Sequence, residues 1–394
     1  MVRRNGGFIG TDGLDAPDPP TGISASAGDT AISISFTAPT DVGTSAITGF
    51  VATTDDGNGG TGTSSPITIS SLTNGTAYTA RVYAINAYGT SAASDATDSV
   101  TPAAAIGLFA LGYAGATVNT IDQIAIATTG NSTDFGDLTV ARNDVGGAFG
   151  SATRGVFGGG TNDSGESNVI DYVTFASAGN ATDFGDFASG TLRRGAGLSS
   201  TTRGVFGGGY NGSSVINVIQ YVTIANTGNT TDFGDLSGTR YKQGASSSPT
   251  RGVFGGGEVT PGGSLSNIME YITIASTGNV TDFGDLSAAK ENVVSGSSTT
   301  RALFAAGNTG SLTDVIEYIT IASTGNVTDF GNLSSARKDC HPASSSLRCV
   351  FGGGATNILE YVTIASTGNV TDFGDLSASC EANSACSGSH GGIA

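Results

Sequence analysis

The stretches Arg154-Gly-Val-Phe-Gly-Gly-Gly160 and Thr182-Asp-Phe-Gly185 decide the fold, because both recur along most of the sequence. The second recurs six times, and its Phe falls at Phe135, Phe184, Phe233, Phe283, Phe330 and Phe373, with spacings of 49, 49, 50, 47 and 43 residues. The first recurs in five units, which open at Arg154, Arg203, Arg251, Arg301 and Arg348. In these five units a Tyr stands twelve residues before the Phe, so nearly all length variation falls between the Gly run and the Tyr.

A period of 43–50 residues with three or four short strands is typical of a β-propeller blade, because one four-stranded sheet cannot bury both of its faces alone. The repeat has, in order, an apolar run, a Gly doublet, the Tyr, the aromatic residue and then a basic residue, although the first unit has Gln123 in place of the Tyr. We place the basic residue of the first five units at Arg142, Arg194, Arg240, Lys290 and Arg337. This order resembles kelch repeats, with Phe where kelch blades usually carry Trp. The resemblance covers residues 103–394 and implies an all-β, six-bladed kelch-like propeller.

The two ends of the repeat region complement each other. The first unit opens at Gly107 without the strand that precedes the Gly-rich strand in the other units. The segment Glu381-Ala-Asn-Ser-Ala-Cys-Ser-Gly-Ser389 follows the sixth Phe unit at that missing position. We therefore expect the C-terminal strand to pair with the first unit, close the propeller and remove an exposed sheet edge.

The N-terminal part has the alternation of a β-sandwich. Ala31-Ile-Ser-Ile-Ser-Phe36 and Ile67-Thr-Ile-Ser70 alternate apolar and polar residues between turns. The run from Leu72 to Gly89 resembles the fibronectin type III signature, which implies corner packing by Leu72 and Tyr78, with Phe36 at the usual Trp position. We expect three regions: a flexible docking arm at 1–15, which carries Arg3 and Arg4, a fibronectin type III-like domain at 16–102, and the propeller at 103–394.

Composition narrows the classes of function. The chain of 394 residues has 62 Gly and a net charge of −17, which disfavours binding to nucleic acid or to an anionic membrane surface. It has no run of 18 apolar residues, and its start lacks the apolar core of a secretion signal. Four cysteines lie in the last 55 residues without a CxxC pair, and we expect buried free thiols at Cys340, Cys349, Cys380 and Cys386.

The sequence motifs do not indicate a catalytic site. Asp-Phe-Gly occurs six times, whereas a kinase carries one such motif together with a His-Arg-Asp loop. The two histidines, His341 and His390, have no partner at metal-ligand spacing, so a copper site like that of galactose oxidase is not expected. The sequence predicts a protein that is not an enzyme and uses no cofactor or metal.

Short strings near the N-terminus suggest a context. Arg3-Arg-Asn-Gly-Gly-Phe-Ile-Gly10 and Thr37-Ala-Pro-Thr-Asp-Val-Gly-Thr-Ser-Ala-Ile-Thr-Gly49 resemble virion structural proteins of tailed phages that infect marine cyanobacteria. The resemblance implies a virion appendage or decoration protein, assembled in the host cytoplasm, that docks on other virion proteins through its N-terminal part. The alternative is a bacterial surface or secreted adhesin that binds carbohydrate.

Loops that vary within a constant frame are where partners are usually recognised. We therefore expect the variable segments after each Gly run to share one face and to contact host surface polysaccharide. Tyr210 would stack on sugars and the other side chains would hydrogen-bond to them. The candidate residues are Asn162, Asp163, Glu166, Tyr210, Asn211, Glu258 and Asn308.

Overall fold

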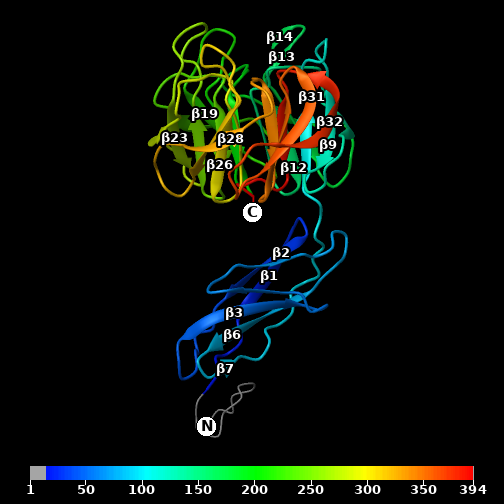
Figure 1. The fold of residues 1–394 in the computed structure, drawn as a ribbon, viewed down its shortest axis with the longest axis vertical. Helices are drawn as coiled ribbons and strands as arrows, with labels where there is room; N and C mark the ends of the chain where they lie inside the picture. The colour runs from blue at the N-terminus through cyan, green and yellow to red at the C-terminus, as the bar shows by residue number, and fades with distance from the viewer. Residues whose placement is uncertain (1–14, 394) are drawn as a thin grey trace. The chain divides into compact units, whose positions relative to one another are not determined.

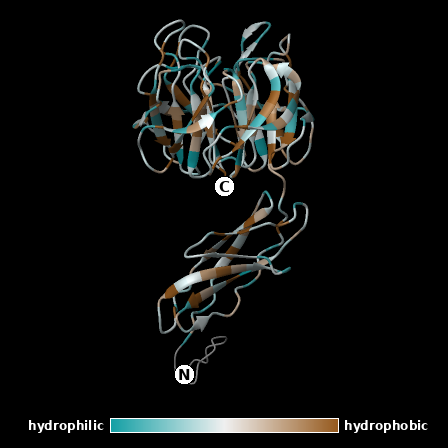
Figure 2. Cartoon of the chain, viewed as in Figure 1, coloured by the Kyte–Doolittle hydropathy of each residue, from teal (hydrophilic) through white to brown (hydrophobic). Residues whose placement is uncertain are grey.

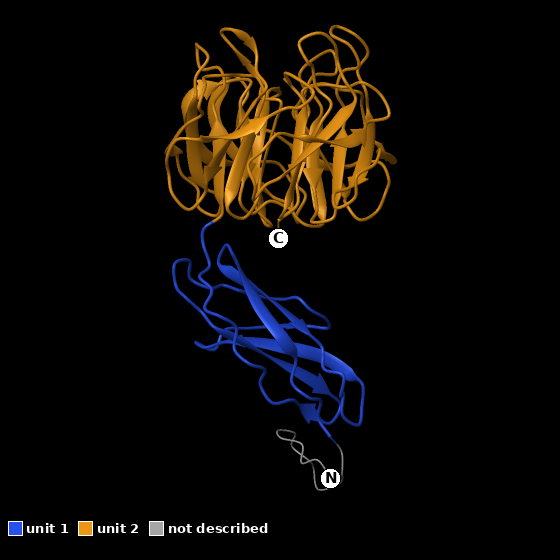
Figure 3. Cartoon of the chain, turned by 180° about the vertical axis from the view of Figure 1, so that it is seen from behind, with its two compact units in different colours: residues 1–104 blue, residues 105–394 orange. Residues whose placement is uncertain are grey.

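The computed structural model describes residues 15–393, which fold into two compact units, one up to Ala104 and one from Ala105 onward (Figure 3). Every regular element in this described range is a β-strand, so the protein is all-β (Figure 1). No helix there could span a membrane. Arg3, Arg4 and nearly all of the expected docking arm lie outside the described residues.

Unit 1 is a two-sheet sandwich. One sheet has the order β1-β2-β5 and the other has the order β4-β3-β6-β7. The expected corner is present, because Leu72 and Tyr78 are buried and the Tyr78 hydroxyl accepts a 3.0 Å hydrogen bond from the Thr73 N–H. Phe36 packs on Phe50 in the core, with ring centroids 4.8 Å apart. The strands are β1 (Thr21–Gly28), β2 (Ala31–Thr37), β3 (Ile47–Thr54), β4 (Gly59–Gly62), β5 (Ile67–Ser70), β6 (Ala80–Asn86) and β7 (Gly89–Thr90).

Unit 2 contains six four-stranded sheets, whose strands carry most of the hydrophobic residues (Figure 2). The first sheet combines β8 (Ile106–Ala110), β9 (Thr120–Ala125) and β10 (Thr133–Asp137) with the C-terminal strand β33 (Ser384–Ser387). β33 runs antiparallel to β8, with Ser384 opposite Ala110 and Ser387 opposite Gly107. The pairing expected for the C-terminal segment is therefore present.

The other five sheets each use four strands of one repeat. The second sheet contains β11 (Gly147–Gly150), β12 (Arg154–Gly158), β15 (Val169–Thr174) and β16 (Thr182–Asp186). The third contains β17 (Ala196–Ser199), β18 (Arg203–Gly207), β19 (Val218–Thr223) and β20 (Thr231–Asp235). The fourth sheet contains β21 (Gly244–Ser247), β22 (Arg251–Gly255), β23 (Ile268–Thr273) and β24 (Thr281–Asp285). The fifth contains β25 (Val294–Ser297), β26 (Arg301–Ala305), β27 (Val315–Thr320) and β28 (Thr328–Asn332). The sixth is β29 (Cys340–Ser344), β30 (Arg348–Gly353), β31 (Thr356–Thr363), β32 (Thr371–Cys380), and a separate hairpin joins β13 (Thr161–Asn162) to β14 (Gly165–Glu166).

The first strands of the sheets lie side by side around a central channel. β11, β17, β21, β25, β29 and β33 are neighbours in that order, β33 also contacts β11, and all six line a cavity of about 60 Å³. Serine hydroxyls join them: Ser199 Oγ donates to the Gly150 carbonyl at 2.6 Å, and Ser247 Oγ donates to the Ser199 carbonyl at 2.7 Å. Small residues therefore let these strands approach one another closely.

The Asp-Phe-Gly motif links neighbouring sheets. In each repeat the Phe carbonyl accepts a hydrogen bond of 2.7 or 2.8 Å from a Gly N–H of the next repeat, from Phe135 with Gly179 through to Phe373 with Gly130. The motif Gly has φ between +141° and +151°, and a Cβ there would lie 2.3–2.5 Å from a carbonyl oxygen of the next repeat. Only Gly fits this close approach, so the motif has a structural role.

The Arg that opens each Gly-rich strand also links two sheets. Arg203, for example, places its guanidinium 4.3 Å from the Tyr221 ring centroid and donates a 2.8 Å hydrogen bond to the Ile274 carbonyl of the next repeat. Tyr221 in turn packs edge-on against Phe233. The same arrangement recurs at Arg154, Arg251, Arg301 and Arg348.

A buried ion pair joins most neighbouring repeats, and here one sequence assignment needs correction. Arg142 with Asp171 and Lys290 with Glu317 form pairs of 2.8 and 2.9 Å, and Arg240–Glu270 and Arg337–Glu360 are equivalent. We placed Arg194 at this position in the second repeat, but the buried residue there is Leu192. Arg194 lies two residues after Leu192, just as Lys242 lies two residues after Arg240, so its equivalent in the next repeat is Lys242.

Candidate functional site

One position per repeat holds a residue with left-handed backbone geometry at one end of the channel. These residues, which we call the mouth ring, have φ between 50° and 59° although none is glycine. Such a conformation is uncommon for non-Gly residues and marks a position that the surrounding structure enforces. They line a cavity of about 30 Å³ and are Asp144, Arg194, Lys242, Asn292, Asp339 and Ala382.

Main-chain hydrogen bonds hold consecutive members of the mouth ring. The Asp144 N–H donates to the Ala382 carbonyl at 3.2 Å, the Arg194 N–H to Asp144 at 3.0 Å, and the Lys242 N–H to Arg194 at 2.7 Å. The backbone is thus constant while the side chain differs from repeat to repeat. The ring presents different chemistry on one scaffold.

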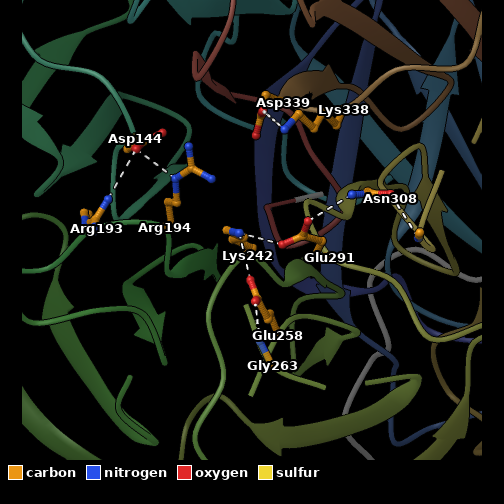
Figure 4. A network of polar contacts seen from close by, with 11 residues as sticks. Asp144, Arg193, Arg194, Lys242, Glu258, Gly263, Glu291, Asn308, Lys338 and Asp339 are labelled. Carbon is orange, nitrogen blue, oxygen red and sulfur yellow. Dashed lines mark hydrogen bonds and ion pairs between the residues drawn. The ribbon is translucent and has the colours of Figure 1, made fainter. Parts of the chain in front are cut away.

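A network of charged side chains surrounds the ring (Figure 4). Asp144 pairs with Arg194 at 2.8 Å and lies 3.8 Å from Arg193, whose Nε lies 3.4 Å from Glu166. Lys338 and Asp339 form a looser pair at 3.9 Å. Positive and negative groups therefore lie close together around the mouth.

Lys242 is the most firmly held cation of this network. Its Nζ lies 2.8 Å from Glu258 and 2.5 Å from Glu291, which also accepts a hydrogen bond from Asn308 Nδ2 at 3.1 Å. Burial alone would raise the pKa of Glu258. The hydrogen bond from Lys242 and its positive charge outweigh this effect and lower the pKa to about 2. Both groups are therefore charged at neutral pH.

The distribution of cations singles out this mouth. Of the sixteen Lys and Arg in the chain, Arg3, Arg4 and Arg81 precede unit 2, which leaves thirteen. Five of these stack on Tyr or support the strands, and four form the buried pairs. The remaining four are Arg193, Arg194, Lys242 and Lys338, and all belong to the mouth network.

The predicted loops begin beside this network. Backbone bridges join Thr161 to Asn143, Tyr210 to Arg193, Glu258 to Tyr241 and Asn308 to Glu291. Each of these inner residues directly precedes a member of the mouth ring. Loop and ring are therefore parts of one surface.

The predicted contact residues differ in their availability for a ligand. Asp163 is exposed, and Asn162 and Glu166 lie half-buried on the β13–β14 hairpin. One face of Tyr210 carries the Arg193 guanidinium, 4.7 Å from the ring centroid, and Asn211 Oδ1 accepts N–H groups of its own turn. Glu258 is only 3% exposed, so we correct its expected role: it holds Lys242 and does not face solvent.

The sequence did not predict one hollow of this mouth. It measures about 360 Å³ and combines residues from the first and second repeats with residues near the C-terminal strand. Backbone hydrogen bonds of 3.0 Å in both directions join Tyr113 to Glu381. Tyr113 follows Gly112 as Tyr210 follows Gly209, a signal that the degenerate first unit obscures. We call this site the seam hollow, and its lining is Tyr113, Asn143, Asp144, Arg194, Lys338, Asp339, Glu381 and Ala382.

Comparison with known protein families identifies one part of the chain. The fibronectin type III domain model matches residues 18–100. Unit 1 contains a fibronectin type III domain. No curated protein matches the sequence.

In the fibronectin type III domain, the polar side chains Arg81 and Asn86 bind main-chain carbonyls of the same domain. Its one described cation, Arg81, donates a 2.7 Å hydrogen bond to the Ser94 carbonyl. Asn86 Nδ2 donates to the carbonyls of Asp15 and Val42, each at 2.9 Å. These contacts stabilise loops, in contrast to the charged mouth of unit 2.

The end of the channel away from the mouth ring holds the C-terminal tail. His390 Nε2 lies 3.0 Å from Ser199 Oγ and 3.1 Å from the Gly150 carbonyl, and the Gly391 N–H donates to Ser297. Burial lowers the pKa of His390 to about 4. His341 lies at the other end, beside the mouth ring, and its Nδ1 is 3.1 Å from Asn383 Oδ1. Within residues 15–393 no three His, Cys, Asp or Glu side chains gather in a group that could hold a metal ion.

The four cysteines are buried and unpaired, as predicted. Burial raises the pKa of the Cys340 thiol to about 11 and that of Cys380 to about 12. Such thiols stay protonated at neutral pH and are poor nucleophiles. They act as small core residues.

Proposed function

We propose that unit 2 is a six-bladed, kelch-like β-propeller and that the protein is a non-enzymatic structural component of a virion that displays a glycan-binding face. In this proposal the N-terminal arm and the fibronectin type III domain dock on other virion proteins. The propeller mouth contacts polysaccharide of the host surface.

Repetition supports the propeller. Six four-stranded sheets each contribute a first strand to one channel, and the chain of Phe-to-Gly hydrogen bonds returns from Phe373 to Gly130. Propeller architectures bury sheet faces against neighbouring sheets in this way. The order of Gly run, Tyr and aromatic residue supports the kelch-like assignment.

The observation that carries the binding role is the placement of cations. All four unit 2 cations that do not serve the sheets lie at the mouth, in a chain of net charge −17. Loops and mouth ring vary there while the sheets repeat. Variable polar groups on a rigid frame are typical of ligand recognition.

Mass spectrometry of purified phage particles tests the virion assignment. The expected result is that peptides of this chain co-purify with particles in fixed proportion to the major capsid protein. Their absence from particles, with the protein found on bacterial surfaces or in medium, would favour an adhesin.

A truncation tests docking separately. Removal of residues 2–13 should leave a soluble protein with an unchanged melting temperature that no longer enters particles, because the arm carries Arg3 and Arg4 to an acidic neighbour. Normal incorporation of the truncated protein would contradict the docking role. Deletion of residues 162–165 in the β13–β14 hairpin serves as the matched control and should not affect incorporation.

A further inference from the structure

We propose that the seam hollow binds one neutral, hydroxyl-rich sugar residue, stacked on Tyr113. This inference rests on the proposed glycan-binding function and names the ligand class and the subsite. The hollow of about 360 Å³ lies at the lower end of the ~300–1,000 Å³ typical of small-molecule sites. That volume suits a single monosaccharide unit better than a long oligosaccharide.

Tyr113 supplies the apolar contact. It is 39% exposed, and its main chain is fixed by two hydrogen bonds to Glu381. No cation stacks on its ring in the described structure, in contrast to Tyr210 beneath Arg193. An aromatic ring held in this way offers its face to the C–H side of a sugar and its hydroxyl to a polar neighbour.

Polar groups beside Tyr113 are available for sugar hydroxyls. Among the described residues, the carboxylate of Glu381 and the side-chain amide of Asn143 make no hydrogen bond or ion pair. Lys338 is 43% exposed and only loosely paired with Asp339. A hydroxyl both donates and accepts, so it is matched by a wall that carries carboxylate acceptors next to ammonium and amide donors.

Charge selects a neutral sugar over an acidic one. Three carboxylates of the hollow, Asp144, Asp339 and Glu381, face two cations, Arg194 and Lys338. Arg194 already gives its Nε to Asp144. A uronic acid, sulfate or phosphate would meet the unpaired Glu381 carboxylate in a strongly acidic protein, and like charges repel.

A glycan microarray probed with the full chain tests the proposal. The array carries neutral hexose glycans, uronic acid glycans and sulfated glycans. We expect binding to a neutral class, a decrease of at least tenfold with Tyr113→Ala, and no change with Tyr88→Ala, an exposed tyrosine of the fibronectin type III domain. Circular dichroism melting of each variant separates loss of binding from loss of fold.

The variant Glu381→Gln should change the affinity for neutral and for acidic sugars in opposite directions. Loss of the carboxylate acceptor should weaken a neutral sugar several-fold, whereas removal of a negative charge should strengthen an acidic one. Preferential binding of the parent protein to acidic glycans would overturn the proposal, as would neutral binding that Glu381→Gln and Tyr113→Ala leave unaffected. If the chain binds no glycan, both this inference and the glycan-binding role fail, while particle mass spectrometry still decides the virion assignment independently.

Discussion

The circumference of unit 2 and the mouth of its channel are built from the same six repeats. They differ in which side chains stay the same from one repeat to the next. On the circumference every repeat uses the same Phe-Gly hydrogen bond, and five of the six share the Arg–Tyr–Phe stack. At the mouth the backbone repeats, but the side chains are Asp, Arg, Lys, Asn, Asp and Ala. Constant side chains hold the sheets together, and variable ones are free to contact a ligand.

Deletion of residues 380–394 should have the largest effect on the frame. It removes β33, which completes the first sheet, together with the tail contacts to Ser199 and Ser297. We expect cooperative thermal unfolding of unit 2 to be lost, because β8 becomes an unpaired edge. Calorimetry of the truncated and parent proteins measures this, and a melting transition like that of the parent would contradict the role of β33.

Loss of one buried cation should have the next largest effect. Arg240→Leu leaves Glu270, 3% exposed, without its partner, and should lower the free energy of unfolding by about 3–5 kcal/mol. Denaturant titration measures the difference.

The second repeat supplies the matched control for that variant. There the two equivalent positions hold the uncharged residues Leu192 and Gln220, and Gln220 forms hydrogen bonds of 2.7 Å with Ser189 and Thr230. The double variant Arg240→Leu, Glu270→Gln should recover most of the lost stability. A double variant as unstable as the single one would mean that the buried charge is not the cause.

A smaller loss should follow from Gly234→Ala. The Gly234 φ is +148°, and a Cβ would lie 2.4 Å from the Gly278 carbonyl oxygen, so strain of about 1–3 kcal/mol or more is expected. Gly238→Ala is the control, because no atom lies within 4 Å of its added Cβ and its φ is not positive. Equal denaturation midpoints for the two variants would argue against the Phe-Gly contact as a frame element.

The smallest effect concerns the tail and depends on pH. The folded-state pKa of His390 is about 4, below the ordinary ~6.5, so the neutral form is the one that fits. The contribution of His390 to the stability of the bound tail is complete above pH 6.5. It decreases as pH falls toward 4, because the imidazole binds a proton more readily when the tail is released. Hydrogen exchange at residues 388–393, corrected for intrinsic rates, should be faster at pH 5 than at pH 7 in the parent and independent of pH in His390→Gln. The same pH dependence in both proteins would exclude His390 as the cause.

The frame could be predicted from the sequence because its contacts repeat at fixed spacing. Phe135 through Phe373 and the opening Arg residues identify sheets whose backbone contacts are local or lie one repeat apart. The C-terminal strand could be placed because the first unit lacks exactly one such strand in the sequence.

The mouth could be predicted only in part, since it depends on contacts between different repeats. Arg194 was misplaced because the ion-pair position of this repeat holds Leu192, and the cations that follow belong to the mouth. Glu258 reads as a loop residue, but Lys242 reaches it from the preceding segment and the pair becomes buried. Tyr113 and Glu381 come from opposite ends of the repeat region, and only the β8–β33 pairing brings them together.

Replacement of the variable loops tests most directly the claim that the frame holds the fold and the mouth recognises the ligand. Residues 162–165, 211–214, 259–264 and 309–311 would be exchanged for the short turn at Ala355, and Tyr113→Ala would be added to alter the seam hollow. Tyr210, Glu258 and Asn308 stay in place against the mouth ring. Melting temperature and adsorption to host cells would be measured on the same preparation. We predict a melting temperature within a few degrees of the parent and abolished adsorption. A variant that still adsorbs, or one that no longer folds, would contradict the separation between frame and mouth.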